Sequence, residues 1–178
     1  MATLGGVIIR KATAGDWPAI WPFLRQICAE GETYSYPQDI DEHFAREIWL
    51  QKPPGRTVVA VDDGADETVG GTGAARVLGT AKMGPNQMGG GSHVATASFM
   101  VAPEAAGQGV GRALGEHVVA WARGAGYRAI QFNAVVESNR RAVHLWRSLG
   151  FEIMATLPEA FRSPTHGYVG LHVMYQML

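Results

Sequence analysis

The chain has 178 residues, which fits one domain, and 47% of them are hydrophobic against 17% charged, as in a globular protein with an apolar core. Its 15 Lys and Arg residues and 16 Asp and Glu residues leave a net charge of −1. This balance excludes the strongly basic surface with which proteins bind nucleic acids or anionic membranes.

The first part of the chain is expected to form one strand and two helices. Residues 7–10 (VIIR) are mostly β-branched and predict a strand. Apolar residues spaced by three or four positions over residues 17–28 predict a helix, with Asp16 as its cap and Gly31 at its end. Residues 39–50 predict a second helix, because acidic residues fill its first turn, where the helix dipole favours them.

Three strands are expected in the middle of the chain. Residues 57–61 are largely β-branched, and residues 62–64 are typical of a turn after them. Residues 69–80 predict a paired strand, although they hold many glycines, and residues 83–93 predict a loop. Residues 93–101 alternate small or polar with apolar residues and predict the third strand.

The last part of the chain is expected to contain two helices and three strands. The apolar face of the first helix lies within residues 114–122, and residues 129–136 predict a strand after it. Ser138 is expected to cap a second, short helix. Residues 151–157 and 172–178 predict the closing strands.

The resulting order, β-α-α-β-β-β-α-β-α-β-β, predicts a mixed α/β fold in a single domain over residues 1–178. The only cysteine, Cys28, excludes an intrachain disulfide, and its apolar surroundings predict burial in the core. The N-terminus lacks the features of a signal peptide, and no window approaches the roughly 20 apolar residues of a membrane span. We therefore expect a cytoplasmic protein that binds no membrane.

Three glycines at alternate positions, Gly107, Gly109 and Gly111, precede a helix in the stretch AAGQGVGRAL. Glycine allows positive φ and brings backbone N–H groups close to a ligand, and a helix N-terminus suits an anion. The stretch lacks the lysine of a P-loop and the spacing of a GxGxxG dinucleotide motif. A pyrophosphate loop for coenzyme A, (Q/R)-x-x-G-x-(G/A), fits better, although its first position is Ala106. A glycine-rich turn without a ligand is the alternative.

The neighbours of this loop carry a family resemblance within residues 93–157. A strand that ends in MVAP precedes the loop, and a helix and a further strand follow it. SNRRAVHLWRSLGFE then matches the pattern N-x-x-A-x-x-(F/L)-(Y/W)-x-x-x-G-F. The chain thus resembles the GNAT superfamily of acetyltransferases, in element order over about residues 5–178. The resemblance implies a mixed, twisted sheet of six or seven strands with a splayed parallel pair, flanked by about four helices.

Four further segments are similar to motifs of one bacterial GNAT group: GETY (31–34), PNQMGGGSHV (85–94), IQFNAVV (130–136) and LPEAF (157–161). The last of these predicts a turn. The group is similar to the yeast enzymes that acetylate azetidine-2-carboxylate and related proline analogues.

The resemblance implies acetyl-CoA as the acetyl donor and no metal. The pantetheine arm would enter between strands at 94–101 and 129–135 and pair with backbone groups near Phe99 and Val101. Asn139 would hydrogen-bond the pantetheine, as its place in the family motif implies. The pyrophosphate would lie on the N–H groups of Gln108, Gly109, Val110, Gly111, Arg112 and Ala113.

The resemblance also implies an acceptor side. Asn133 matches an asparagine that contacts the substrate in the proline-analogue enzymes, and it is a candidate for both catalysis and substrate binding. The facing position, usually asparagine in this group, is Thr96. Glu32 and Tyr34 lie in a loop expected to cover the acceptor; Glu32 is a candidate general base and Tyr34 a candidate substrate ligand. Many GNAT enzymes protonate the CoA thiolate with a tyrosine, but Trp146 occupies that position, and an indole does not serve as this acid.

The implied function is N-acetylation of a small-molecule amine, with an amino acid or proline analogue as one candidate acceptor. A homodimer is a further expectation, because GNAT proteins often dimerise; no nucleic-acid partner is expected. Two alternatives stay open. One is a CoA-binding regulatory or sensor module with little catalysis, and the other is an acetyltransferase of protein N-termini or lysines.

Overall fold

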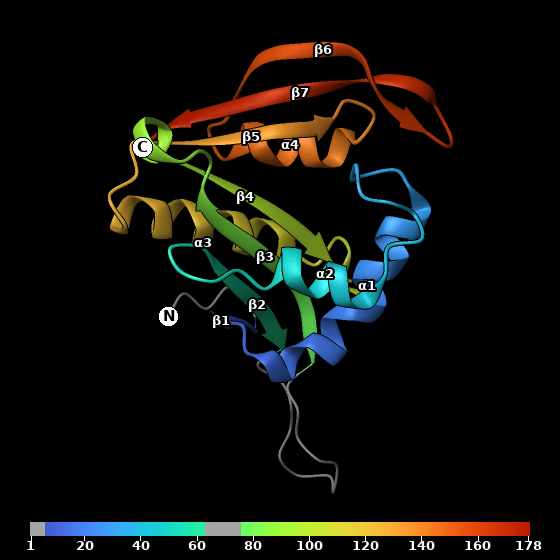
Figure 1. The fold of residues 1–178 in the computed structure, drawn as a ribbon, viewed down its shortest axis with the longest axis vertical. Helices are drawn as coiled ribbons and strands as arrows, with labels where there is room; N and C mark the ends of the chain where they lie inside the picture. The colour runs from blue at the N-terminus through green and yellow to red at the C-terminus, as the bar shows by residue number, and fades with distance from the viewer. Residues whose placement is uncertain (1–5, 63–75) are drawn as a thin grey trace, which may run out of the picture.

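The computed structural model describes residues 6–62 and 76–178, and within these ranges seven strands form one mixed sheet in the order β1-β2-β3-β4-β5-β7-β6 (Figure 1). The strands are β1 (Val7–Lys11), β2 (Arg56–Asp62), β3 (Val77–Pro85), β4 (Val94–Val101), β5 (Ala129–Val136), β6 (Glu152–Ser163) and β7 (Gly167–Met177). The α-helices are α1 (Trp17–Glu30), α2 (Glu42–Trp49), α3 (Val110–Gly124) and α4 (Arg140–Ser148). The expected mixed α/β class and element order are confirmed.

Two neighbouring residues of β3 show that helices cover both faces of the sheet. A Cβ built on Gly79 would lie 3.0 Å from the Val110 side chain of α3. The next residue, Thr80, instead accepts a hydrogen bond from Trp49 of α2, with Nε1 to Oγ1 at 3.1 Å. Successive strand residues face opposite sides, so α3 and α2 lie on opposite faces. Helix α1 packs with α2, and α4 lies beside α3, where a Cβ on Gly115 would meet Leu149 (Figure 1).

The parallel pair β4–β5 is joined only at its beginning. The register pairs Val94 with Ala129 and Ala95 with Ile130, and the strands then separate. β4 stays paired with β3 to its end, and β5 stays paired with β7, with a register shift between Phe132 and Val135. The expected splayed pair is therefore present, and both of its strands are held from their outer sides.

The closing hairpin is longer than expected. The segment LPEAF (157–161), predicted as a turn, lies inside β6, which continues to Ser163. A register shift between Leu157 and Phe161, with Glu159 at φ +53°, absorbs the irregular residues. Because β7 pairs with β6 on both sides of this shift, the strand bulges and does not turn.

Three local expectations also need correction. Asn139, not Ser138, caps α4: its Oδ1 accepts a hydrogen bond from Ala142 N at 3.2 Å. The second helix begins at Glu42, after Asp41, whose side chain caps it. The expected strand at 69–80 begins at Val77; its first residues, and most of the turn at 62–64, lie outside the described residues.

The core lies on both sides of the sheet. Cys28 is 1% exposed, as its apolar stretch predicts, and burial raises the pKa of its thiol. Trp49, Ile20 and Leu114 are fully enclosed. Of the helices in the described ranges, none combines the length and the apolarity needed to cross a bilayer.

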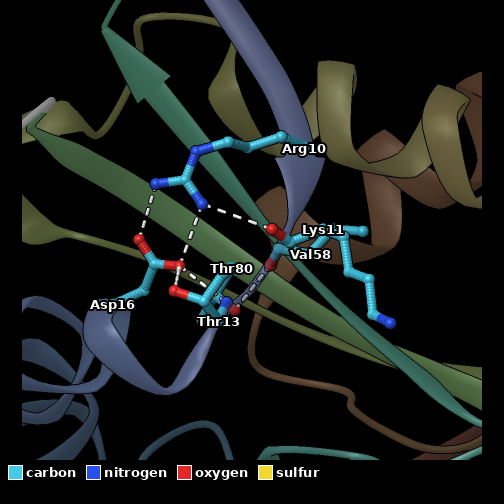
Figure 2. Close-up of polar contacts among 6 residues, drawn as sticks. All are labelled: Arg10, Lys11, Thr13, Asp16, Val58 and Thr80. Carbon is cyan, nitrogen blue, oxygen red and sulfur yellow. Dashed lines mark hydrogen bonds and ion pairs between the residues drawn. The ribbon is translucent and has the colours of Figure 1, made fainter.

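A partly buried ion pair joins β1 to the start of α1 (Figure 2). The Asp16 carboxylate accepts hydrogen bonds from Arg10 Nη2 at 2.6 Å and Nη1 at 2.9 Å, and from the Thr13 N–H at 2.7 Å. Asp16 precedes the helix as expected, but its side chain makes no capping bond to it. The bond from Arg10, above all, lowers the pKa of Asp16 from 3.8 to about 2.

We expect Asp16→Asn to lower the free energy of unfolding by about 2 kcal/mol at neutral pH, the value that corresponds to this pKa change. Because the folded-state pKa is depressed, the contribution is complete above pH 4 and is lost as the pH falls towards 2. Urea denaturation of both proteins between pH 2 and 7 measures it. Asp39→Asn, at an exposed carboxyl, is the control; an equal loss in both variants would contradict the assignment.

Candidate active site

A cavity of about 290 Å³ lies where β4 and β5 separate. The loop between α1 and α2 closes one side of it, and α4 closes another. Its walls consist of hydroxyl, amide, aliphatic and aromatic side chains. They come from Thr33, Tyr34, Ser35, Tyr36, Thr96, Ala97, Ser98, Phe99, Phe132, Asn133, Ala134, Val135, Val136, Asn139, Ala142 and Trp146.

The pairing of β4 with β3 decides which of its backbone groups face this gap. In an antiparallel pair, every second residue exchanges hydrogen bonds with the partner strand. The Ala102 N–H bonds to the Leu78 carbonyl at 2.9 Å, so residues an even number of positions before Ala102 bond to β3. The intervening residues, Ala97, Phe99 and Val101, therefore direct their N–H and C=O groups towards β5. Phe99 and Val101 are two of the positions expected to pair with a ligand.

Tyr34 contacts Phe99, the middle one of these three residues. Its hydroxyl donates to the Phe99 carbonyl and accepts from the Phe99 N–H at 3.0 Å. The ring stacks on Tyr36, with centroids 5.4 Å apart, and burial raises the Tyr34 pKa far above its usual value. The neutral Tyr34 hydroxyl thus bonds to backbone groups at the edge of β4 that β5 leaves unpaired. Its loop lies beside the cavity, where it was expected.

Tyr36 connects the cavity to a lysine that the sequence analysis did not single out. Lys82 Nζ donates to the Tyr36 hydroxyl at 2.9 Å and to the Ile48 carbonyl at 3.0 Å. The ammonium also lies 5.3 Å from the centre of the Trp49 ring. Burial lowers the Lys82 pKa and raises that of Tyr36 to about 12. This cluster fixes the far end of the loop.

Glu32, expected as a general base, makes a different set of contacts. Its carboxylate accepts hydrogen bonds from Ser163 Oγ at 2.5 Å, Thr165 Oγ1 at 2.6 Å and Thr165 N at 2.9 Å. These bonds, chiefly that of Ser163, lower the Glu32 pKa and make the carboxylate a weaker base. Glu32 fastens the loop to the turn between β6 and β7, while its neighbours Thr33 and Tyr34 face the cavity.

Asn133 lies in the bulge of β5 and faces the cavity, as expected of a substrate contact. Its Nδ2 donates to Asn86 Oδ1 at 2.7 Å, and its Oδ1 accepts from Gln131 Nε2 at 2.8 Å. Asn86 belongs to the PNQ segment, so two of the quoted motifs meet here. Thr96 lines the same cavity from β4 and is half-buried.

The glycine loop forms the start of α3. Gly107 and Gly109 have φ of +79° and +83°, a conformation that favours glycine, and Gly109 is the N-cap. Of the expected N–H donors, Gln108 bonds to the Ala105 carbonyl at 3.3 Å and Ala113 bonds to the Gly109 carbonyl at 3.0 Å. The N–H groups of residues 109–112 are those at the open helix end.

Two polar side chains flank this end. Arg112 donates to Ser148 Oγ at 2.7 Å and pairs with Glu116 at 3.6 Å, so its guanidinium lies against α4. Asn139 uses Oδ1 as the cap of α4 and borders the cavity. The lack of a side chain at Gly111 and Gly115 lets α3 lie close to Leu145 and Trp146 of α4 and to Leu149, the residue after it.

Trp146, at the position where the resemblance implies a tyrosine acid in many enzymes, belongs to the core. It is 7% exposed and packs against Phe99, Phe132 and Phe151, with the Phe99 ring centroid 4.5 Å away. The four rings form the floor beneath the separated strands. Such ring contacts are typical of aromatic side chains in a core.

A model of the acetyltransferase (GNAT) family matches residues 21–151, a range that includes β4, the glycine loop, β5 and α4. The chain belongs to the GNAT family. This GNAT protein is also 31% identical over 98 residues to the N-acetyltransferase aca1 of Schizosaccharomyces pombe. That match covers 54% of this chain and 47% of aca1, so the chain spans about half the length of this curated relative.

Solved structures of GNAT proteins have the same fold. A GCN5-related N-acetyltransferase from Kribbella flavida is 52% identical, with a TM-score of 0.89 over 97% of this chain and 98% of the other. A phosphinothricin acetyltransferase from Sinorhizobium meliloti, solved in complex with AcCoA, is 21% identical, with a TM-score of 0.81 over 97% of this chain and 89% of the other. At that identity the second likeness concerns the fold alone.

We expect Tyr34→Phe to lower the free energy of unfolding by about 1–2 kcal/mol, because the Phe99 N–H and C=O lose their partner. Hydrogen exchange of the Phe99 amide should accelerate, and urea denaturation measures the stability. Tyr168→Phe, at a ring that is 67% exposed, is the matched control. Unchanged exchange at Phe99 would show that Tyr34 does not protect this edge.

Proposed function

We propose that this GNAT protein transfers the acetyl group of acetyl-CoA to the amine of a small molecule. The observation that carries the proposal is the early separation of β4 from β5, which leaves backbone groups of β4 facing a cavity beside the glycine-started helix α3. An extended ligand can pair with such an edge as an added strand does. The pantetheine arm has the required amide groups.

The cofactor side consists mainly of backbone groups. Phe99 and Val101 would pair with the pantetheine, Val101 directly and Phe99 once the Tyr34 hydroxyl withdraws. Asn139 would donate from Nδ2, because its Oδ1 caps α4. The N–H groups of Gly109, Val110, Gly111 and Arg112 would hold the pyrophosphate, with Gln108 and Ala113 completing the loop around them.

The acceptor side consists of uncharged polar groups. Asn133 lines the cavity from β5, Thr96 lines it from β4, and Tyr34 lines it from the loop. A wall of amides and hydroxyls in a cavity of this size supports a small acceptor. An amino acid or proline analogue is the finer proposal, with Asn133 as the residue that contacts it; Thr96 in place of an asparagine alters that contact.

The proposed reaction needs an unprotonated amine, which adds to the thioester carbonyl. A backbone N–H of β4 would stabilise the oxyanion, and the C–S bond then breaks to give the amide and CoA. Positioning of the two reactants between the strands supplies part of the acceleration. Because Glu32 is bonded to the β6–β7 turn, we assign it to holding the loop.

The buried free thiol of Cys28 agrees with a cytoplasmic location.

A CoA-binding module with little catalysis is the second candidate, favoured by Trp146 at the position of the tyrosine acid. An assay of CoA release with azetidine-2-carboxylate, proline, phosphinothricin and putrescine separates the two. Turnover of any amine supports the transferase. Binding of acetyl-CoA without turnover supports the module, and no thermal shift at excess acetyl-CoA overturns both.

We expect Gly109→Val to raise the Kd for acetyl-CoA about tenfold or more, because a β-branched residue at φ +83° reshapes the pyrophosphate loop. Gly126→Val is the matched control: its φ is +81°, and, like Gly109, it has open space around a Cβ. Both variants should lose similar stability, and calorimetric titration should show weakened binding only for Gly109→Val. Equal affinities would show that the loop does not hold the cofactor.

We expect Asn133→Ala to raise the acceptor KM or lower kcat about tenfold, the effect of a lost hydrogen bond to substrate. The Kd for acetyl-CoA should stay the same, since Asn133 lies on the acceptor side of the gap. Steady-state kinetics with the best acceptor and titration with acetyl-CoA measure the two effects. A weakened Kd would place Asn133 among the cofactor contacts.

A further inference from the structure

A chain of three amides crosses the gap near the point where β4 and β5 part. Gln131 Nε2 donates to Asn133 Oδ1 at 2.8 Å, and Asn133 Nδ2 donates to Asn86 Oδ1 at 2.7 Å. The three residues come from two segments, β5 and the end of β3, and Asn86 is 47 positions from Asn133 in the sequence. Only Asn133 also lines the cavity.

The backbone is paired regularly at Asn86 and Gln131, the two ends of this series of amides, but not at Asn133 in its middle. The Asn86 N–H donates to the Val94 carbonyl at 2.8 Å, which continues the β3–β4 ladder by one residue. Gln131 belongs to the regular part of β5, where it pairs with Tyr175 of β7. Asn133 lies within the register shift that follows, so the backbone alone fixes its side chain less well.

The direction of the hydrogen bonds between the three amides has a chemical consequence. An amide has two N–H donors and an oxygen with two lone pairs. One donor of Asn133 is used on Asn86 and one lone pair on Gln131, which leaves the amide with one further N–H and one further lone pair. Reversing the amide would exchange the positions of the donor and the acceptor presented to the cavity.

We infer that Asn86 and Gln131 are positioning residues that set the direction of the Asn133 amide, so that the site recognises an amine carrying a hydrogen-bond acceptor on the neighbouring carbon. An α-amino acid or its amide has this arrangement, with the amine N–H for Oδ1 and the carbonyl or carboxylate oxygen for Nδ2. The inference rests on the proposed function and adds the residues that decide its acceptor.

Two isosteric substitutions test the direction, because a carboxylate accepts hydrogen bonds but cannot donate them. In Asn86→Asp, the carboxylate still accepts from Asn133 Nδ2. In Gln131→Glu, it faces Asn133 Oδ1 and repels it. Both variants add one negative charge beside Asn133, so charge alone affects them alike. Asn86→Ala removes the bond without adding charge.

We expect Gln131→Glu and Asn86→Ala to raise the KM for prolinamide about three- to tenfold, the effect of one misdirected hydrogen bond, with kcat changed less than twofold. Asn86→Asp should remain within twofold of the unchanged chain. Prolinamide is used because, unlike proline, it has no carboxylate for the added charge to repel. The Kd for acetyl-CoA should be the same in all four proteins.

Equal losses in the two charged variants, or a loss confined to Asn86→Asp, would overturn the inference. Failure of the proposed function gives a different result, because the protein without substitutions would then turn over no amine in the panel. In that case the side-chain NH₂ resonances of Asn133 decide the direction. They should be retained in Asn86→Asp and shifted in Gln131→Glu; the opposite pattern would overturn it.

Discussion

The early separation of β4 from β5 is the constraint on which the rest of the site depends. β4 bonds to β3 along its whole length but to β5 only at Val94 and Ala95, so alternate residues keep backbone groups directed into a gap. Polar groups in such a place cost free energy unless they find partners. The Tyr34 hydroxyl is one partner in this structure, and a ligand with amide groups is another. The gap thus leaves an edge of β4 for the Tyr34 hydroxyl or for the proposed ligand.

Two residues fix the loop that covers the gap, one through a neutral side chain and the other through a charged one. Tyr34 bonds as a neutral hydroxyl, which burial favours, whereas Glu32 bonds as a carboxylate that three donors stabilise. One residue attaches the loop to β4 and the other attaches it to the β6–β7 turn. A cofactor that displaces Tyr34 from Phe99 therefore acts on a loop whose other anchor is the hairpin. The hairpin thus helps to hold the loop that borders the cavity.

Helices and strands with a clear hydrophobic periodicity were predictable from the sequence, whereas the contacts between them were not. Residues 129–136 form β5 as expected, because a β-branched and apolar run there has no competing helical spacing. The strand at 151–157 was predicted too short because the resemblance implied a turn at 157–161, whereas pairing with β7 at Leu157 and again at Phe161 keeps these residues within β6. The quoted motifs contained Asn133 and Asn86. Their contact, like that of Glu32 with Ser163, joins positions far apart in the chain and follows from the fold alone.

The two sides of the proposed site would hold their reactants with different groups. This difference bears on how the acceptor amine loses its proton. In the proposed site, backbone groups would hold the cofactor, while Asn133 and Tyr34 would border the acceptor, and burial keeps the Tyr34 hydroxyl protonated at neutral pH. Such groups orient an amine and donate hydrogen bonds, but they do not remove its proton. Trp146 places an apolar ring where a tyrosine acid would otherwise stand, and it supports the floor of the gap. The described walls of this site therefore favour positioning over acid–base catalysis, so the rate of transfer should depend on how much of the acceptor arrives unprotonated.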